Sequence, residues 1–307
     1  MSGYLSRQYA WSLAEFGDPR QLPSSKGWIL EREIPDRPGR DAMGIYPLFV
    51  CDDWSGLADD LHGLSRELVS LVLVADPIAE IEPESLDRCF NRGVRPFKRH
   101  HVVELDRPVR ELASPHHRRN SVRALRDVEV EHLEDPSLFL EEWISMYNVL
   151  IRRHEIQGIG TFSPSSFAKQ FDAPGLVAFR AEFAGETVGM LIWYVEGETA
   201  YYHLGAYSTL GYQRNASFAL FWRAIEFFTG KVRRLNLGAG AGCDDGSGGL
   251  DRFKAGWATG TKIAYLCRHV FQPERYEQLC STLGDPESPY FPAYRSGERE
   301  RSPSLRG

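Results

Sequence analysis

Hydrophobic and polar residues repeat along this chain with the two periods that distinguish helices from strands. Apolar residues at three- and four-residue spacing predict amphipathic helices over 54–68, 136–155 and 218–229. Three apolar runs joined by tight turns, at 176–183, 187–197 and 199–208, predict an antiparallel meander. Further runs of this kind predict strands at 44–50, 70–76, 95–105, 233–240 and 262–271. The pattern indicates an α+β (mixed α/β) fold.

The order of these elements divides the chain into two predicted halves and a tail. The first half spans 1–127 and the second spans 128–285, which has the clearer order of helices and strands. Residues 286–307 are rich in Pro, Ser, Gly and charge, which predicts a disordered tail.

Composition narrows the class of protein. A formal charge of -6 provides no overall basic field, so DNA binding is not expected and any RNA would need a local patch. The apolar runs are strand-sized and no signal segment is visible, which predicts a cytoplasmic protein without a membrane span. Five scattered cysteines indicate neither a disulfide framework nor a zinc site.

Several stretches together resemble a known family. The order YYHLGAYS, GYQRNASFALFWRAIEFF, RRLNLGAG and GLDRFKAGW resembles the C-terminal half of the Fem-type and BioF2-like branch of the GNAT acyltransferases. HHRRNSVRALRDVEVEHL resembles the basic helix that joins the two halves in that branch. The resemblance implies tandem GNAT-like halves, each a mixed, mostly antiparallel sheet flanked by helices. It also implies transfer of an acyl or aminoacyl group, as in the peptidoglycan bridge-forming aminoacyltransferases.

The identity of the donor depends on one loop. GNAT acetyltransferases bind pyrophosphate with a glycine-containing loop, whereas this chain keeps the glutamine and lacks the glycines. Acyl-CoA is the expected donor and aminoacyl-tRNA is the alternative. The residues predicted to bind the donor are Gln213, Arg214, Asn215, Ala216, Ser217, Phe253 and Lys254; Ser217 could instead act only as a helix N-cap.

Strict alternation along 199–208 places Tyr201, His203, Gly205 and Tyr207 on one face of the strand. His203 is the leading candidate for proton acceptor, because imidazole titrates near neutrality. Tyr207 could take the same role. The alternative for His203 is a core histidine with hydrogen-bonded nitrogens.

Lys254 is the third catalytic candidate. Phe253 and Trp257 lie four residues apart on one helix face and are expected to pack inward, with Lys254 beside them. The resemblance implies that this lysine contacts a phosphate or carbonyl oxygen of the donor. The alternative is a solvated lysine on an amphipathic turn.

The acceptor is expected to be an amine of a sugar, a peptide or another small molecule. The positive charge of 114–127 suits an acidic acceptor or a donor phosphate, although a solvated basic face is the alternative. No metal is expected, because His100 and His101 point to opposite faces of a strand. The residues predicted to bind the acceptor are His116, His117, Arg118, Arg119, Tyr201, Asp244, Asp245 and Trp257.

No nucleophile elbow or Ser-His-Asp order is present in the sequence, which favours direct transfer without a covalent acyl-enzyme. Two alternatives to an acyl-CoA-dependent N-acyltransferase remain open. One is a Fem-like transferase that uses aminoacyl-tRNA. The other is a GNAT-like scaffold that binds a ligand or protein without catalysis.

Overall fold

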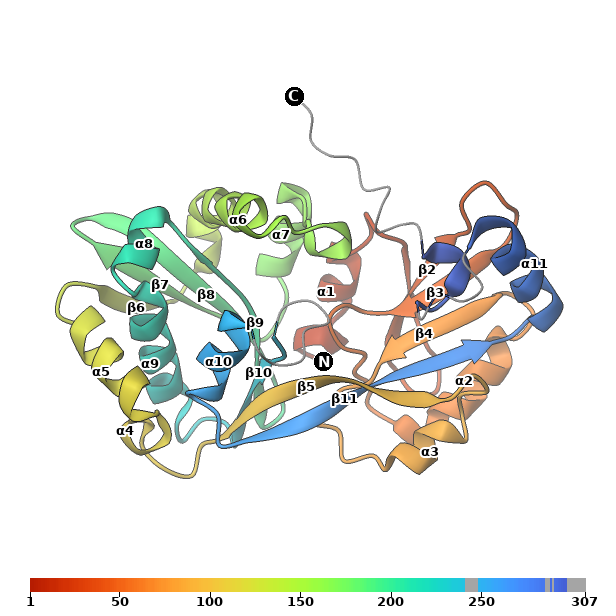
Figure 1. Ribbon diagram of the computed structural model, residues 1–307, viewed down its shortest axis with the longest axis horizontal. Helices are drawn as coiled ribbons and strands as arrows, with labels where there is room; N and C mark the ends of the chain where they lie inside the picture. The colour runs from red at the N-terminus through yellow and green to blue at the C-terminus, as the bar shows by residue number, and fades with distance from the viewer. Residues whose placement is uncertain (241–247, 285–287, 289, 297–307) are drawn as a thin grey trace. The chain divides into compact units, whose positions relative to one another are not determined.

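The chain has the predicted mixed α/β fold, and its computed structural model describes residues 1–240, 248–284, 288 and 290–296 (Figure 1). Its residues form two compact units, and neither unit is a continuous segment. Unit 1 consists of Met1–Gln8, Lys98–Glu155 and Phe167–Ile263. Unit 2 consists of Tyr9–Phe97, Ile156–Ser166 and Ala264–Gly307, within the limits of the described residues.

The sheet of unit 1 contains one parallel strand pair. Successive antiparallel pairing joins β6 to β7, β8 and β9, β9 then pairs in parallel with β10, and β10 pairs antiparallel with β5. The strands are β5 (Val94–Glu104), β6 (Glu129–Leu133), β7 (Leu176–Phe183), β8 (Glu186–Glu196), β9 (Thr199–Tyr207) and β10 (Arg234–Gly238).

Unit 2 repeats this order with fewer strands. Its strands β1, β2 and β3 pair antiparallel, β3 pairs in parallel with β4, and β4 pairs antiparallel with β11. A helix joins the two parallel strands in each unit, α2 here and α9 in unit 1. The strands are β1 (Asp18–Gln21), β2 (Trp28–Glu33), β3 (Arg40–Gly44), β4 (Ser70–Val74) and β11 (Gly260–Val270).

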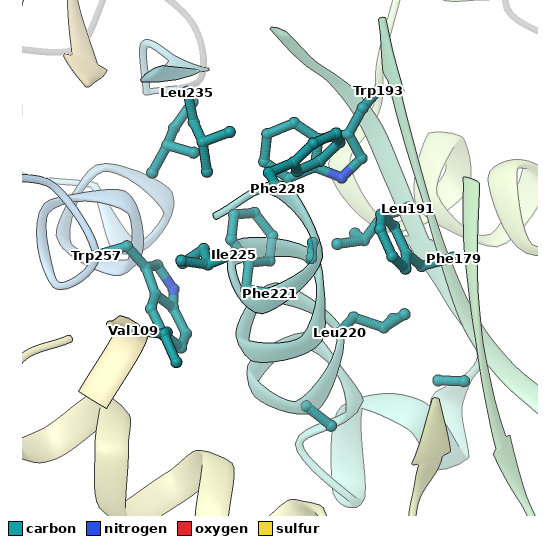
Figure 2. Close-up of a cluster of buried hydrophobic side chains, with 14 of the residues drawn as sticks. Val109, Phe179, Leu191, Trp193, Leu220, Phe221, Ile225, Phe228, Leu235 and Trp257 are labelled. Atoms are coloured by element: carbon teal, nitrogen blue, oxygen red, sulfur yellow. The ribbon is translucent and has the colours of Figure 1, made fainter. Parts of the chain in front are cut away.

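The core of unit 1 is built around α9 (Ala216–Phe228), whose apolar residues recur at helical spacing. Figure 2 shows Phe221 and Phe228 of α9 between the sheet residue Trp193 and other core side chains. Trp257 stacks on Phe221 at a ring distance of 5.9 Å from the opposite side. The strands of the meander and the segment after α10 (Gly249–Ala255) are therefore packed on one helix.

The predicted helices over 54–68 and 136–155 correspond to η2 with α2 and to η3 with α6. Ser114 caps α5 by accepting from the His117 amide, and the stripe predicted on 136–155 is buried at Trp143, Met146 and Tyr147. The helices are α1 (Arg7–Ser12), α2 (Leu57–Leu64), α3 (Pro83–Asp87), α4 (Val109–Leu112), α5 (Pro115–Ala124), α6 (Leu140–His154), α7 (Pro164–Phe171), α8 (Thr209–Gln213) and α11 (Pro273–Leu283). Short 3-10 turns are η1 (Gly3–Leu5), η2 (Trp54–Gly56), η3 (Pro136–Phe139), η4 (Gly158–Gly160) and η5 (Ala293–Arg295).

Two predictions about unit 2 are corrected. The strand expected at 44–50 is instead β3 (Arg40–Gly44), because Pro47 has no N–H to continue the ladder. The disorder expected after Asp285 does not hold for Ala293–Arg295, which forms the 3-10 turn η5. The Arg295 guanidinium donates to the fully buried carboxylate of Asp41 at 2.5 Å, and Tyr294 donates to the same oxygen.

The halves 1–127 and 128–285 are continuous segments, whereas the compact units interleave; the assignment of catalysis to the second half stays a prediction. The cysteines that the structure describes are free thiols, namely Cys51, Cys89, Cys267 and Cys280. Cys243 lies outside the described residues.

Candidate functional site

The two parallel strands of unit 1 separate after a short paired stretch. β9 and β10 pair at Thr199 with Arg234, Ala200 with Leu235, and Tyr201 with Asn236. Among the described residues this parallel pairing ends there, although β9 continues to Tyr207. Where two parallel strands part, backbone N–H and C=O groups of the facing edges can bind an extended ligand.

A β-bulge in β9 changes which side chains share a face. Tyr202 pairs with Trp193 and Leu204 with Ile192, so His203 is the extra residue. The prediction that Tyr201, His203, Gly205 and Tyr207 lie on one face is therefore wrong, because it assumed strict alternation.

On one side of β9, Tyr202, Gly205 and Tyr207 lie opposite Trp193, Leu191 and Gly189 of β8 and face the α9 core. The hydroxyls of Tyr202 and Tyr207 share a hydrogen bond. A Cβ on Gly205 would lie 2.5 Å from the Tyr202 hydroxyl, so this position requires glycine. Burial raises the pKa of both tyrosines, which keeps them as neutral hydrogen-bonding groups.

On the other side of β9, His203 is held at both ring nitrogens. Nδ1 lies 3.2 Å from the Tyr4 hydroxyl and Nε2 lies 3.1 Å from the side-chain oxygen of Gln170. Burial lowers the pKa of His203 to about 3, so the ring is neutral at physiological pH. These contacts are those of a core histidine, and its role as proton acceptor stays a prediction.

Lys254 lies at the separation of β9 and β10, on the side that faces α9. Its side chain is only 5% exposed, so it is not a solvated surface lysine. Nζ donates to the carbonyl of Ala239, just after β10, at 2.6 Å and lies 5.3 Å from the centre of the Tyr202 ring in β9. It therefore lies between the residue that follows β10 and the Tyr202 ring of β9.

The environment of Lys254 favours an uncharged amine. Burial lowers its pKa to about 7, with a further contribution from the positive charge of Lys98, while Asp251 opposes the shift. Neutral and protonated forms are both populated near neutral pH. Such a group can accept a proton or donate a hydrogen bond.

Two side-chain contacts fix the short helix that carries Lys254. Asp251 accepts a hydrogen bond from His101 at 2.8 Å, which ties α10 to β5. His117 of α5 bonds through Nε2 to the carbonyl of Phe253 at 2.8 Å. A Cβ on Gly256 would lie 2.0 Å from the His117 ring, so glycine is needed for this packing. His117 thus supports α10, and its contact with the acceptor stays a prediction.

Two buried polar residues that the sequence analysis did not assign to the site lie on the side of the sheet that faces away from α9. His100 of β5 and Asn236 of β10 are both buried, and Nδ1 of the histidine lies 3.0 Å from Oδ1 of the asparagine. Burial lowers the pKa of His100 to about 4. His100 and His101 contact different partners on opposite faces of β5, as alternation predicts. The sequence feature that could have identified Asn236 is its position as a polar residue between two leucines of β10.

The predicted donor loop lies directly before α9. Asn215 takes the left-handed conformation, φ 58° and ψ 34°, that a glycine would otherwise supply, and asparagine tolerates it better than most residues. It also occupies the N-cap position, so the N-cap alternative for Ser217 is not realised. Arg214 is exposed, with its guanidinium 4.2 Å from the centre of the Phe183 ring. Gln213 is also exposed and Ala216 is buried.

The other predicted residues separate into exposed and buried groups. His116, Arg118 and Arg119 are exposed on α5, whereas Tyr201 and Trp257 are buried, Trp257 completely. Phe253 is half-buried against Phe218 and Phe221. Asp244 and Asp245 lie outside the described residues.

Within the described part of the chain, no group of three His, Cys, Asp or Glu side chains could hold a metal ion. The described helices include none that is both long and apolar enough to cross a bilayer.

Comparison with known proteins gives one family match. Residues 116–255, which include α5, the meander, α9, β10 and α10, match the model of the acetyltransferase (GNAT) domain family. No curated protein sequence matches the chain.

Solved structures resemble the chain over most of its length. FemX is 12% identical with a TM-score of 0.68, and the match covers 89% of this chain and 93% of FemX. L-PGS from Bacillus licheniformis is 17% identical with a TM-score of 0.60, over 87% of this chain and 88% of that one. The C-terminal domain of a putative lysylphosphatidylglycerol synthetase from Agrobacterium fabrum is 15% identical with a TM-score of 0.59, over 87% and 88%. At these identities the likeness concerns the fold.

Proposed function

We propose that acyl-CoA is the donor of this acyltransferase, because residues 116–255 match the acetyltransferase (GNAT) domain family and the chain resembles FemX in fold. The proposed acceptor is an amine of a sugar, a peptide or another small molecule. The acyl group passes directly from donor to amine. We place the reaction in the cytoplasm, where acyl-CoA is available.

The observation that carries this proposal is the buried amine of Lys254 beside diverging strands β9 and β10. Acyl transfer to an amine requires a group near the reacting carbonyl that can take up a proton. Lys254 suits that role because burial holds its pKa at about 7. In this proposal the thioester extends between the two strands, and Tyr202 and Tyr207 form part of its wall.

The loop at the start of α9 suits the phosphates of coenzyme A. The first amides of a helix have no carbonyl partner in their own helix and favour an anion there. Asn215 supplies the left-handed turn, and the exposed Arg214 can add a positive charge. We assign Gln213, Arg214 and Ser217 to the phosphate end of the donor and Lys254 to its carbonyl end.

Aminoacyl-tRNA is the second candidate donor, and the exposed surface of α5 favours it. Arg118, Arg119 and Arg123 are exposed there, and Arg126 follows directly after the helix. A local group of arginines can bind a phosphate backbone even on a chain of net charge -6.

Calorimetric titration distinguishes the two donors. We would titrate the full chain with acetyl-CoA and with a long-chain acyl-CoA, and compare Arg214→Ala with Arg223→Ala. Arg223 is a matched control because it is exposed later on α9 and pairs with Glu226. We expect micromolar binding that weakens about tenfold only in Arg214→Ala, the loss of one charged contact of about 1.4 kcal/mol. Absence of acyl-CoA binding, with transfer from a charged tRNA instead, would select the second candidate.

A further inference from the structure

Asn236 is a buried polar residue at the separation of β9 and β10. Asn236 pairs with Tyr201 in the last parallel pair of these strands, and it is only 2% exposed. The α9 face of β10 is occupied by the apolar Leu235 and Leu237, so Asn236 lies on the opposite face.

The orientation of the Asn236 amide follows from its hydrogen bonds. The backbone N–H of Gly238 donates to the side-chain Oδ1 at 2.9 Å, which identifies this atom as the acceptor oxygen. His100 Nδ1 lies 3.0 Å from the same oxygen and must therefore carry the proton of the neutral ring. Two donors thus fix Oδ1 and determine where the NH₂ group points.

The NH₂ group has no such contact. Nδ2 of Asn236 is buried and has no hydrogen-bond partner among the residues that the structure describes. Buried donors in folded proteins nearly always have a partner, so one without a protein partner indicates a bound water or ligand. We propose that Nδ2 of Asn236 donates to the acyl carbonyl oxygen of the donor thioester, an inference that rests on the proposed function.

Gly238 lies next to both the Asn236 amide and the amine of Lys254. Its N–H fixes Asn236, and a Cβ on Gly238 would lie 3.2 Å from Nζ of Lys254. Asn236 and Lys254 therefore both lie beside Gly238. A carbonyl between the diverging strands can accept from Asn236 while Lys254 stays available for the proton.

The reaction assigns a step to each group. The acceptor amine attacks the carbonyl carbon, a C–N bond forms, and the C=O π electrons move to the oxygen that Nδ2 contacts. The tetrahedral intermediate then collapses, the C–S bond breaks, and the amine proton passes through Lys254 to the departing thiolate. The products are the amide and free coenzyme A. The Nδ2 hydrogen bond to the carbonyl oxygen is already in place and stabilises the negative charge that develops on that oxygen.

The test compares Asn236→Ala and Asn236→Asp with Asn148→Ala, an exposed asparagine on α6 that serves as control. The aspartate variant keeps an acceptor for Gly238 and His100 but removes the donor, so it tests the same contact if the alanine variant fails to fold. We would measure kcat and KM for the acyl-CoA donor and the infrared carbonyl stretch of bound [1-¹³C]acetyl-CoA.

We expect kcat to fall about 10²-fold in both Asn236 variants, with little change in KM for the donor. The carbonyl band of the bound donor should lie below that of free acetyl-CoA in the wild type and return toward it in the variants. Wild-type kcat and band position in a folded Asn236 variant would overturn the inference and leave the proposed function standing. A wild-type enzyme that binds no acyl-CoA would reject both, and the preceding titration would already show it.

Discussion

The side-chain nitrogen of Lys254 lies 2.6 Å from the carbonyl oxygen of Ala239, which joins α10 to the residue just beyond β10. The contact holds a buried amine where the parallel strands part. Because His101 and His117 fix α10 from two other elements, the position of this amine depends on the packed unit rather than on a loose surface turn.

Replacing Lys254 with methionine should stabilise the protein, most of all at low pH. The pKa of about 7 in the folded state lies below the ordinary 10.5, so the folded protein binds fewer protons than the unfolded chain between those values. The destabilisation is fully present below pH 7 and disappears as pH rises to 10.5. We expect a gain of roughly 1–3 kcal/mol in the free energy of unfolding at pH 6.5. Urea denaturation at pH 6.5 and 9.5 checks it.

Lys169→Met is the control for this comparison, because Lys169 is exposed on α7 in the same unit. Its effect should be small and independent of pH. A Lys254→Met gain that is equal at both pH values would contradict the buried, uncharged amine.

Acyl transfer should rise with pH through about 7. Lys254 must be neutral to accept a proton, and it becomes neutral above its pKa. Lys254→Ala should lower kcat about 10²-fold and remove this limb of the profile. The pH dependence of kcat with saturating acyl-CoA and acceptor provides the measurement, and a limb that survives in the variant would assign the titration to another group.

His203→Gln should make the protein less sensitive to acid. The folded-state pKa of about 3 lies below the unfolded 6.5, so stability is present above pH 6.5 and is lost as pH falls toward 3. One such proton changes the free energy of unfolding by about 1.4 kcal/mol per pH unit. Urea titrations between pH 6.5 and 4 should show a slope reduced by up to this amount, whereas His154→Gln, exposed on α6, should keep the wild-type slope.

Gly256→Ala should destabilise the support of α10. Its methyl group would lie 2.0 Å from the His117 ring, which is itself packed on Trp257. We expect a loss of about 1–3 kcal/mol by overpacking, measured by thermal unfolding. Gly249→Ala at the start of α10 is the control, because its Cβ would meet no atom within 4 Å. Equal melting temperatures for both variants would refute this packing argument.

The sequence pattern predicted the elements of unit 1 well, because the burial of α9 and the meander follows directly from their periods. It failed where one residue changed the period. The extra residue His203 in β9 moved Tyr207 to the face of Tyr202, and nothing in the alternation signalled this. Asn236 was missed for a different reason, since its importance depends on contacts with His100, which lies 136 residues away.

The segmental composition of the two units has a consequence for biosynthesis. Unit 2 draws on residues from Tyr9 to beyond Ala264, and its strand β4 pairs with β11, from which it is separated in sequence by most of unit 1. While the ribosome is still making the middle of the protein, β4 lacks this neighbour and its edge can pair with other chains. We therefore expect unit 2 to fold only after β11 has emerged, and a nascent chain that ends before Gly260 to need chaperone protection.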